Sequence, residues 1–312
     1  ASRFAGFAGI AGSMAGNAVR AVGAFATTGS VHKASEEMHR RTAEKLAASL
    51  GDMKGLPMKM GQMLSYVDEF IPAKHRTLYR ETLNKLQAKT RPMDWEFIED
   101  TLNENIGKPI ADAFAEFDIE PIAAASIGQV YEARLHDGMK VAVKVQYPGI
   151  AEAIDNDLNN LGAMFKPLLM VIPKVAMSAA AADLQERLIS ECDYPREAEM
   201  QKLFHRLYED DEQIIIPRVI DELCGPQVLV TEFIEGMTYQ DLLEQSTAEE
   251  CSKAGAILCR FAYQSLYQFG ILNTDPHPGN YIFLKDGRVA FLDFGSVQHY
   301  PESMRQAFSN LC

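Results

Sequence analysis

The sequence has few cysteines, and none stands at the spacing of a metal-binding motif. The five cysteines lie at positions 192, 224, 251, 259 and 312, with no Cys-x-x-Cys pair among them. Structural zinc sites draw their ligands from closely spaced pairs, so the sequence excludes a cysteine-based zinc module. Free thiols in a reducing compartment are the expected state.

Positive charge is also scarce. The chain has 30 Lys and Arg residues against 43 Asp and Glu residues, which gives a net charge of −13 at pH 7. Nucleic-acid-binding surfaces need a basic stripe, so we expect no nucleic-acid partner. An acidic chain that binds a phosphorylated ligand must rely on local lysines, backbone N–H groups and a divalent cation.

A hydrophobic run long enough to span a bilayer is missing from the Gly/Ala-rich segment 1–34. Its stretch from Phe4 to Val19 is uncharged for 16 residues, whereas a spanning helix needs roughly 20. Gly12 and Gly16 have the small-residue spacing of closely packed helices. The segment is either a flexible or surface-packed stretch, or an element that contacts a membrane or pairs with another helix.

Periodicity divides the rest of the chain into helical and strand-rich parts. Capping signals accompany the helix that begins after Asp94 and ends near Gly107. A turn at His136-Asp-Gly138 predicts a hairpin, and Pro195 is expected to kink its helix or start a new one. Helices are predicted at about 35–50, 57–69, 74–88, 94–106, 150–165, 182–208, 238–245 and 247–269, and strands at 127–135, 140–146, 214–220 and 227–233.

Two motifs in the last forty residues carry the strongest functional signal. Asp275 is followed five residues later by Asn280, and Asp293-Phe-Gly295 comes thirteen residues after that. This order and spacing is typical of phosphoryl-transfer sites that hold Mg·ATP. We expect Asp275 to orient the attacking hydroxyl or water, and Asn280 and Asp293 to bind Mg²⁺. His277 is expected to support this loop, with a role as base as the alternative.

A lysine that could reach the nucleotide phosphates stands upstream, in Val141-Ala-Val-Lys144. It needs a carboxylate from a neighbouring helix to hold it. Three acids compete for that pairing, and spacing alone leaves the choice open: Glu191, Asp193 and Glu197. The last two are four residues apart and can share a helical face, although Pro195 lies between them.

A glycine-rich phosphate loop is absent where one is expected, and Ala123-Ala-Ala-Ser-Ile-Gly128 stands in its place. Alanine restricts positive φ and close backbone approach, so we expect an altered nucleotide pose or selectivity; a neutral alanine-rich turn is the alternative. The candidate nucleotide-binding residues are Ala123, Ala124, Ala125, Ser126 and Lys144, together with Glu232 and Ile234 at the end of the strand predicted at 227–233.

A methionine-rich helical stretch in the N-terminal region contains Lys59 and Gln62, which are three residues apart and share a helical face. On its own this stretch indicates ordinary core packing.

Together these motifs resemble the ABC1/ADCK/UbiB family of atypical kinases, which includes the Coq8 proteins. The resemblance covers about residues 33–300. It rests on motifs that occur here in one order: Lys59-x-Gly-Gln62, the alanine-rich stretch 123–128, Val141-Ala-Val-Lys144, Glu191-Cys-Asp193-Tyr, Asp275-Pro-His-Pro-Gly-Asn280 and Asp293-Phe-Gly295.

The resemblance implies an α+β, protein-kinase-like two-lobed fold with an N-terminal helical extension. The expected parts are the segment 1–34, the extension 35–117, an N-lobe at 118–235 and a partial C-lobe at 236–312. The first residue is not Met and only 17 residues follow Gly295, so we expect a fragment with a truncated C-lobe.

The resemblance also implies roles for the ambiguous residues. Lys59 and Gln62 would gate the site by meeting Glu191 and Asp193, and Glu197 would pair with Lys144 as a member of the catalytic set.

The activity implied is that of an ATP- and Mg²⁺-dependent atypical kinase or ATPase supporting ubiquinone biosynthesis. The implied partners are a membrane lipid or quinone-like small molecule and other ubiquinone-biosynthesis proteins. The implied place is the matrix side of the mitochondrial inner membrane in a eukaryote, or the cytoplasmic face of the membrane in a bacterium. The alternatives are a Ser/Thr protein kinase and a nucleotide-binding scaffold without turnover. Thr274 stands where a protein kinase usually has the Arg that receives activation-loop phosphate, which argues against the first.

Overall fold

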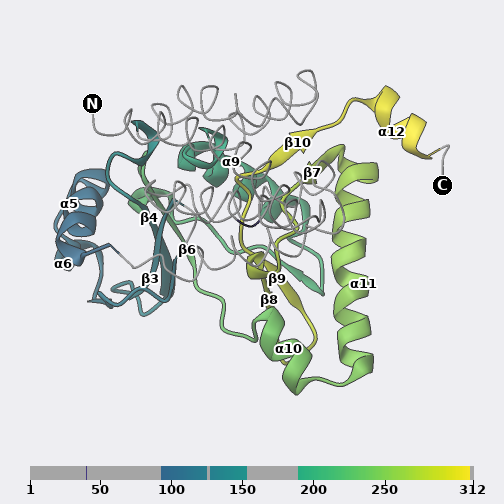
Figure 1. Ribbon diagram of the computed structural model, residues 1–312, viewed down its shortest axis with the longest axis horizontal. Helices are drawn as coiled ribbons and strands as arrows, with labels where there is room; N and C mark the ends of the chain where they lie inside the picture. The colour runs from purple at the N-terminus through teal and green to yellow at the C-terminus, as the bar shows by residue number, and fades with distance from the viewer. Residues whose placement is uncertain (1–39, 41–92, 125–126, 153–188, 310–312) are drawn as a thin grey trace, which may run out of the picture. The chain divides into compact units, whose positions relative to one another are not determined.

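The computed structural model describes residues 93–124, 127–152 and 189–309, together with Arg40 (Figure 1). The chain forms two compact units, and most described residues belong to the one made of 94–124, 129–146 and 190–312. The segment 1–34, the helices expected at 35–50, 57–69 and 74–88, most of the helix expected at 150–165 and the first part of the one expected at 182–208 lie outside the described residues.

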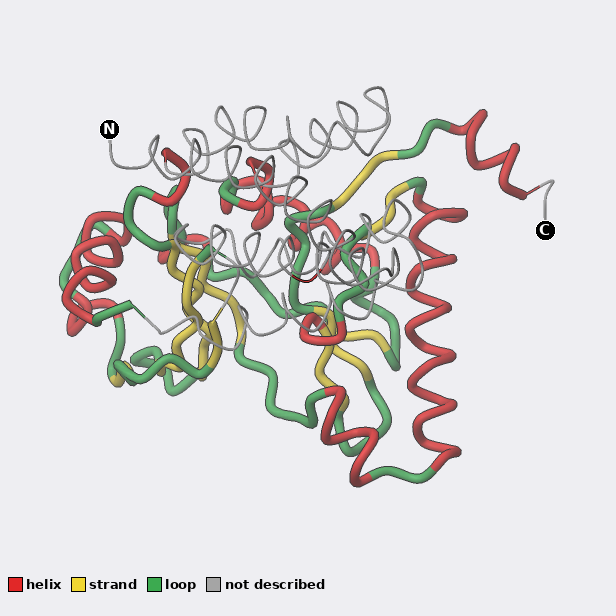
Figure 2. Tube along the Cα trace, in the orientation of Figure 1, coloured by secondary structure: helices red, strands yellow, loops and turns green. Residues whose placement is uncertain are grey.

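A five-stranded sheet carries the strand-rich part of this unit (Figure 2). The hairpin expected around His136-Asp-Gly138 is confirmed, and Gly138 adopts a φ of 89° that favours glycine. Strand order is β1-β3-β4-β6, with β2 also pairing with β3. The strands are β1 (Glu116–Phe117), β2 (Ala123–Ala124), β3 (Gly128–Arg134), β4 (Lys140–Gln146) and β6 (Val228–Glu232).

The residues of β4 alternate in the way that a half-buried strand requires. Val141, Val143 and Val145 alternate along it and are fully buried, while the residues between them are half-buried. β4 pairs antiparallel with β6, with Lys144 opposite Leu229. The alternation therefore directs Lys144 to the face opposite the three valines.

Helices α5 (Trp95–Ile106) and α6 (Ile110–Ala113) precede the sheet, and α5 packs on β4 and β6. Ile98 and Leu102, one turn apart on α5, are fully buried. Gly107 ends α5 with a φ of 70°, as expected. Asp94 is the N-cap residue, but its carboxylate makes no capping hydrogen bond; its backbone carbonyl accepts from Phe97 instead.

Helix α9 (Tyr194–Leu207) starts afresh after a break, which was one of the two outcomes expected from Pro195. Pro195 lies in the first turn, where its missing N–H costs no hydrogen bond. Asp193 is the N-cap, and its carboxylate accepts from the Arg196 N–H at 3.0 Å. The idea that Asp193 and Glu197 share a helical face is therefore wrong, because Asp193 precedes the helix and faces its open N–H groups.

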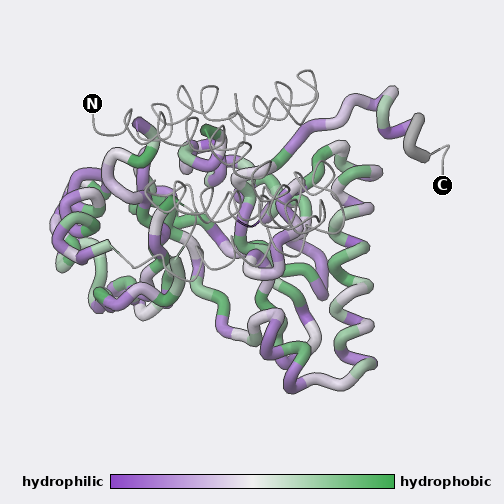
Figure 3. The backbone as a smooth tube through the Cα atoms, in the orientation of Figure 1, coloured by the Kyte–Doolittle hydropathy of each residue, from purple (hydrophilic) through white to green (hydrophobic). Residues whose placement is uncertain are grey.

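The second part of this unit is built around α11 (Ala248–Gln264), whose hydrophobic and hydrophilic residues alternate in Figure 3. Both α10 (Tyr239–Gln245) and α11 begin with capping boxes, from Thr238 and Thr247 respectively. The remaining elements are β5 (Ile214–Ile215), η2 (Asp221–Leu223), the π-helical turn η3 (Ser265–Phe269), β7 (Ile271–Asn273), η4 (Pro278–Asn280), β8 (Tyr281–Phe283), β9 (Val289–Phe291), β10 (Val297–His299) and α12 (Glu302–Ser309).

The strand expected at 214–220 is shorter than predicted. β5 covers only two residues and pairs parallel with β9, and Val219 makes a separate bridge to Thr231. Pro217 lies between them and has no N–H to donate, which explains why the pairing stops. A second hairpin turns at Asp286-Gly287, where β8 and β9 pair antiparallel.

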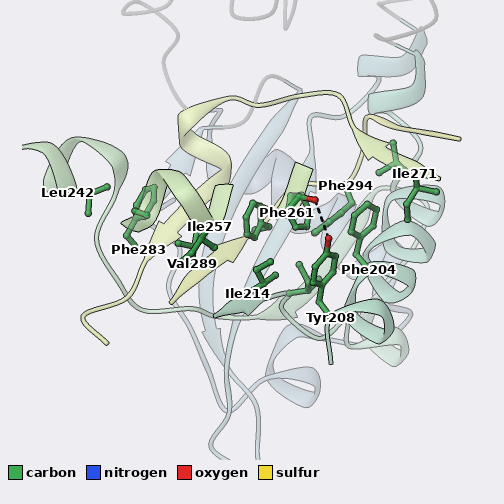
Figure 4. Packing of buried hydrophobic residues seen from close by; sticks show 14 residues of the cluster. Phe204, Tyr208, Ile214, Leu242, Ile257, Phe261, Ile271, Phe283, Val289 and Phe294 are labelled. Atoms are coloured by element: carbon green, nitrogen blue, oxygen red, sulfur yellow. Dashed lines mark hydrogen bonds between the residues drawn. The ribbon is translucent and has the colours of Figure 1, made fainter. Parts of the chain in front are cut away.

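An aromatic core joins α9 to the second part (Figure 4). The ring centroids of Phe204, on α9, and Phe294 lie 4.8 Å apart, and the ring of Phe261, on α11, stacks on that of Phe291. All four side chains are buried. Phe294 is thus fixed beneath α9, which also fixes its neighbours Asp293 and Gly295.

Two polar contacts add to this core at the end of α9. The hydroxyl of Tyr208 lies 3.2 Å from the carbonyl of Phe261 and 2.8 Å from the hydroxyl of Ser265. Arg260 forms a bidentate ion pair with Asp211, including a 2.8 Å hydrogen bond. Both contacts reach α11 or the π-helical turn that continues it.

Four of the five cysteines lie in the part of the chain that the structure describes. Cys192, Cys224, Cys251 and Cys259 carry thiols rather than disulfides, and Cys312 lies outside the described residues. Within the ranges that the structure describes, no helix combines the length and apolar character needed to cross a bilayer.

Candidate functional site

Lys144 lies between two carboxylates that come from different parts of the chain. Its Nζ donates to both carboxylate oxygens of Glu197, at 2.8 and 3.0 Å, and lies 3.4 Å from Oδ2 of Asp293. The side chains of Lys144, Glu197 and Asp293 are 19%, 2% and 31% exposed. Strand β4, helix α9 and the segment after β9 thus meet at one ammonium group.

The contacts of Lys144 show which of the three candidate acids pairs with it, a choice that sequence spacing left open. Glu197 is in the first turn of α9 and its carboxylate is buried against Lys144. Asp193 is an exposed N-cap, and Glu191 lies before the break in the helix. Lys59 and Gln62 lie outside the described residues, so their meeting with Glu191 and Asp193 stays a prediction.

Burial and charge act in opposite directions at this cluster. Burial raises the pKa of Glu197 to about 7, against the opposing effect of the Lys144 ammonium. For Lys144, burial acts to lower the pKa, but Asp293 and Glu197 together hold it well above its ordinary value. Lys144 therefore stays charged at neutral pH, and its ammonium favours the ionised form of Glu197 that burial disfavours.

Tyr194 lies beside Lys144, and sequence reasoning did not single it out. The Lys144 Nζ is 5.0 Å from its ring centroid, within cation–π range. The side chain is fully buried, and its hydroxyl has no hydrogen-bond partner among the described residues. Its place three residues before Glu197, on the same face of α9, was the available signal.

The Asp293-Phe-Gly295 segment is tightly fitted against α9. The Gly295 N–H donates to Oδ1 of Asp293 at 3.0 Å, and the Phe294 N–H donates to the Glu197 carboxylate. A Cβ on Gly295 would lie 3.5 Å from Asp293 Oδ1 and 3.6 Å from Glu197 Oε2. Hence the backbone of this segment reaches both acids that flank Lys144.

Asp275 and Asn280 are joined within a short loop. The Asn280 amide Nδ2 lies 3.2 Å from the Asp275 carbonyl and 3.4 Å from its carboxylate Oδ2. His277 closes the loop, since its Nδ1 accepts from the Gly279 N–H at 3.1 Å. This bond ties the imidazole to the loop backbone, and the supporting role of His277 stays a prediction.

The donor set suits Mg²⁺ rather than a softer metal. Asn280 offers its amide oxygen, because its nitrogen donates to Asp275, and Asp293 offers a carboxylate. Hard oxygen donors, few from the protein and the rest from phosphate and water, are what Mg²⁺ prefers. Among the described residues no three His, Cys, Asp or Glu side chains cluster as a self-sufficient metal site, so phosphate oxygens would have to complete this one.

The candidate nucleotide-contacting residues are only partly described. Ala123 and Ala124 form β2, an exposed two-residue strand opposite Val130 and Gln129 of β3. The part of the alanine-rich stretch formed by Ala123 and Ala124 is therefore an edge strand rather than a turn. Ala125 and Ser126 lie outside the described residues.

Glu232 and Ile234 lie where β6 ends and the connection to α10 begins. Both are half-buried. The Glu232 N–H donates to the Arg218 carbonyl at 2.8 Å, and the N–H of the intervening Phe233 donates to the Lys140 carbonyl at 3.0 Å. These bonds fix the backbone of the connection beside the strand that bears Lys144.

Sequence comparison identifies the family. Residues 85–312 match the family model of the ABC1 atypical kinase-like domain. The atypical kinase COQ8, mitochondrial, of Schizosaccharomyces pombe is 32% identical over 88% of this chain and 44% of its own length. The probable serine/threonine-protein kinase abkA of Dictyostelium discoideum is 33% identical over 83% of this chain and 47% of its own length. The chain therefore spans about half the length of these curated relatives.

A solved structure supports the same fold. The complex of Rv3197 with erythromycin from Mycobacterium tuberculosis superposes with a TM-score of 0.60 at 33% sequence identity. The match covers 87% of this chain and 68% of that one. The expected α+β, kinase-like architecture and the family resemblance are thus both confirmed.

Proposed function

This chain belongs to the ABC1 family of atypical kinases, and from this premise we propose that it binds Mg·ATP and transfers or hydrolyses the terminal phosphate. The observation that carries the proposal is the buried Lys144–Glu197 ion pair beside Asp293. An ion pair so desolvated is costly to form, which favours a functional reason for it over a purely stabilising one.

Each charged side chain has a role in this proposal. Lys144, held by Glu197, binds phosphate oxygens of the nucleotide. Asn280 and Asp293 hold Mg²⁺, which when bound neutralises the charge of the phosphates. Asp275 accepts the proton of the attacking hydroxyl or water, and the Asn280 amide keeps that carboxylate oriented.

The biological setting is a further part of the proposal. The COQ8 relative is named as a mitochondrial atypical kinase, and we propose a role in ubiquinone biosynthesis for this chain as well. The proposed setting is the matrix side of the mitochondrial inner membrane if the source is a eukaryote, or the cytoplasmic face of the membrane if it is a bacterium. A quinone-like molecule, membrane lipid or other proteins of that pathway are the proposed partners.

A Ser/Thr protein kinase is the second candidate, and the name of the Dictyostelium relative favours it. Against it, Thr274 occupies the position before Asp275 where such kinases carry an arginine. Its hydroxyl donates to the Ser296 carbonyl at 2.9 Å, so it braces the segment after Asp293 without offering a charge for a phosphate.

The test combines binding and turnover measurements on three variants. Asp293→Asn should abolish Mg²⁺-dependent ATP binding, because the site loses its anionic metal ligand. Asp275→Asn should bind Mg·ATP normally but release phosphate at least a hundredfold more slowly, as expected for loss of a general base. Asp286→Asn, which changes an exposed aspartate in the β8–β9 turn, is the matched control and should leave both unchanged.

The same experiment separates the alternatives. Phosphate release with or without lipid vesicles supports the proposed ATPase, and phosphate transfer to a protein acceptor supports the protein kinase. Binding without either supports a scaffold. If Asp293→Asn retains Mg²⁺-dependent binding within a few-fold of wild type, the proposed metal site is wrong.

A further inference from the structure

Asn273, at the end of β7, uses both ends of its side-chain amide. Its Nδ2 donates to the backbone carbonyl of Asp293 at 2.6 Å, and its Oδ1 accepts from the Asp275 N–H at 3.1 Å. One side chain therefore bonds the residue proposed as base and the residue proposed as metal ligand. Both bonds go to backbone atoms, so neither uses a carboxylate oxygen of Asp275 or Asp293.

These bonds belong to a closed ring of hydrogen bonds. Asn280 bonds Asp275 through its side chain and, through its carbonyl, accepts from the Leu292 N–H at 3.0 Å. Leu292 precedes Asp293 in the chain, and Asp293 is bonded to Asn273. The ring thus connects Asp275, Asn280 and Asp293, the three residues on which the proposed chemistry depends.

Asn273 closes this ring, although it is proposed neither as the base nor as a metal ligand. The strand pairing between β7 and β10 ends at Asn273, opposite Val297. Beyond that point the loop that bears Asp275 leaves the sheet. Thr274 adds a second brace, with its N–H and its hydroxyl both donating to the Ser296 carbonyl, at 2.8 and 2.9 Å.

We propose that Asn273 is a positioning residue that sets the distance between the Asp275–Asn280 loop and Asp293, and thereby the Mg²⁺ requirement of the nucleotide site. The inference rests on the proposed function. Its physical reason is that Mg²⁺ demands near-ideal ligand geometry, so ligands on two separate loops bind it well only if the loops are held in register.

The variant Asn273→Ser separates the two bonds of the side chain. A serine hydroxyl can still accept from the N–H two residues later, as in other turns of this kind, but it is too short to replace the bond to the Asp293 carbonyl. The matched control is Asn105→Ser. Asn105 has the same pattern away from the site, donating to the Thr101 carbonyl and accepting from the Gln227 N–H, both at 2.8 Å.

The readouts are Mg²⁺ titrations of fluorescent ATP-analogue binding, binding of the same analogue without Mg²⁺, and the melting temperature of the full chain. For Asn273→Ser we expect the half-saturating Mg²⁺ concentration to rise by roughly five- to tenfold, the factor that one lost hydrogen bond can supply. Mg²⁺-free binding should be unchanged, because Lys144 is untouched. Asn105→Ser should titrate with Mg²⁺ as wild type does.

Thr274→Val provides a second variant in case Asn273→Ser does not fold. It removes only the hydroxyl bond to Ser296, and a rise in the Mg²⁺ requirement of roughly two- to threefold is expected. The inference is overturned if wild type binds nucleotide in a Mg²⁺-dependent way and the folded variants titrate identically, or if Asn105→Ser shifts the titration as much as Asn273→Ser. Absence of Mg²⁺-dependent binding by wild type would instead overturn the proposed function, and the inference with it.

Discussion

Glu197→Gln is the most informative change at the candidate site, because it removes a charge while keeping the shape. The glutamine side chain fits the space of the buried carboxylate and can still accept one hydrogen bond from Lys144. Lys144 would keep Asp293, at 3.4 Å, as its remaining charged neighbour. The substitution thus imitates a permanently protonated Glu197.

The magnitude of its effect on stability follows from the raised pKa of Glu197. Below about pH 4.5 the carboxyl is protonated in both folded and unfolded chains. Between 4.5 and about 7 the folded chain holds a proton that the unfolded chain has released, so the stability of wild type falls as the pH rises through this window. The fall amounts to about 3 kcal/mol for a displacement of this size. The glutamine variant has no carboxyl group at this position, so its stability does not fall in this way.

The assay is urea unfolding of wild type and Glu197→Gln at several pH values from 5 to 8. We expect the variant to gain stability relative to wild type as the pH rises, by about 3 kcal/mol over the range. Nucleotide binding should change in the opposite sense, with the variant weaker at pH 8 because Lys144 is held less firmly. Glu249→Gln, which alters an exposed carboxylate paired with Lys253, serves as the control. A difference in stability that does not vary with pH would refute the reasoning.

Two further predictions concern the contacts that hold α9. Asp211→Asn should cost about 2 kcal/mol at neutral pH, because the hydrogen bond from Arg260 lowers the pKa of Asp211 to about 2. That contribution to stability is fully present above pH 3.8, the ordinary pKa of the carboxyl group, and is lost as the pH falls through about 2. The difference in unfolding free energy between wild type and Asp211→Asn should therefore shrink on acidification. Phe204→Ala should cost ~3–5 kcal/mol in urea unfolding and weaken Mg·ATP binding, since Phe294 loses its support; an unchanged binding constant would show that α9 and the metal segment are independent.

Much of the fold was predictable because its signals are local. The alternation of Val141, Val143 and Val145 defines a strand within seven residues, and Gly138 marks its hairpin. Threonine followed three residues later by an acid, at Thr238 and Thr247, marks the starts of α10 and α11. Each of these features depends on neighbours in sequence, so each could be predicted without knowing the tertiary structure.

The site was harder to predict because its key bonds join distant residues. Glu197 could be separated from Asp193 only by knowing where α9 begins, although an aspartate followed by proline two positions later is itself a helix-start signal. The bond from Asn273 to Asp293 spans twenty residues and obeys no spacing rule. Which of these residues bind nucleotide or Mg²⁺ remains a prediction that the proposed variants test.

The fastening of α9 at its carboxyl end has a mechanical consequence for Lys144. Tyr208 and Asp211 fix that end to α11, whereas Glu197 lies eleven residues earlier, in the first turn of the helix. At 1.5 Å per residue, Glu197 sits about 16 Å from this pivot. A tilt of only about 10° would move its carboxylate by about 3 Å, as far as the whole length of its bond to Lys144. A displacement of that size would break the Glu197–Lys144 pair, so the contacts that hold α9 nearer its amino end, from Gln201 to the Pro217 carbonyl and from Arg196 to the Val297 carbonyl, set how firmly the lysine is held.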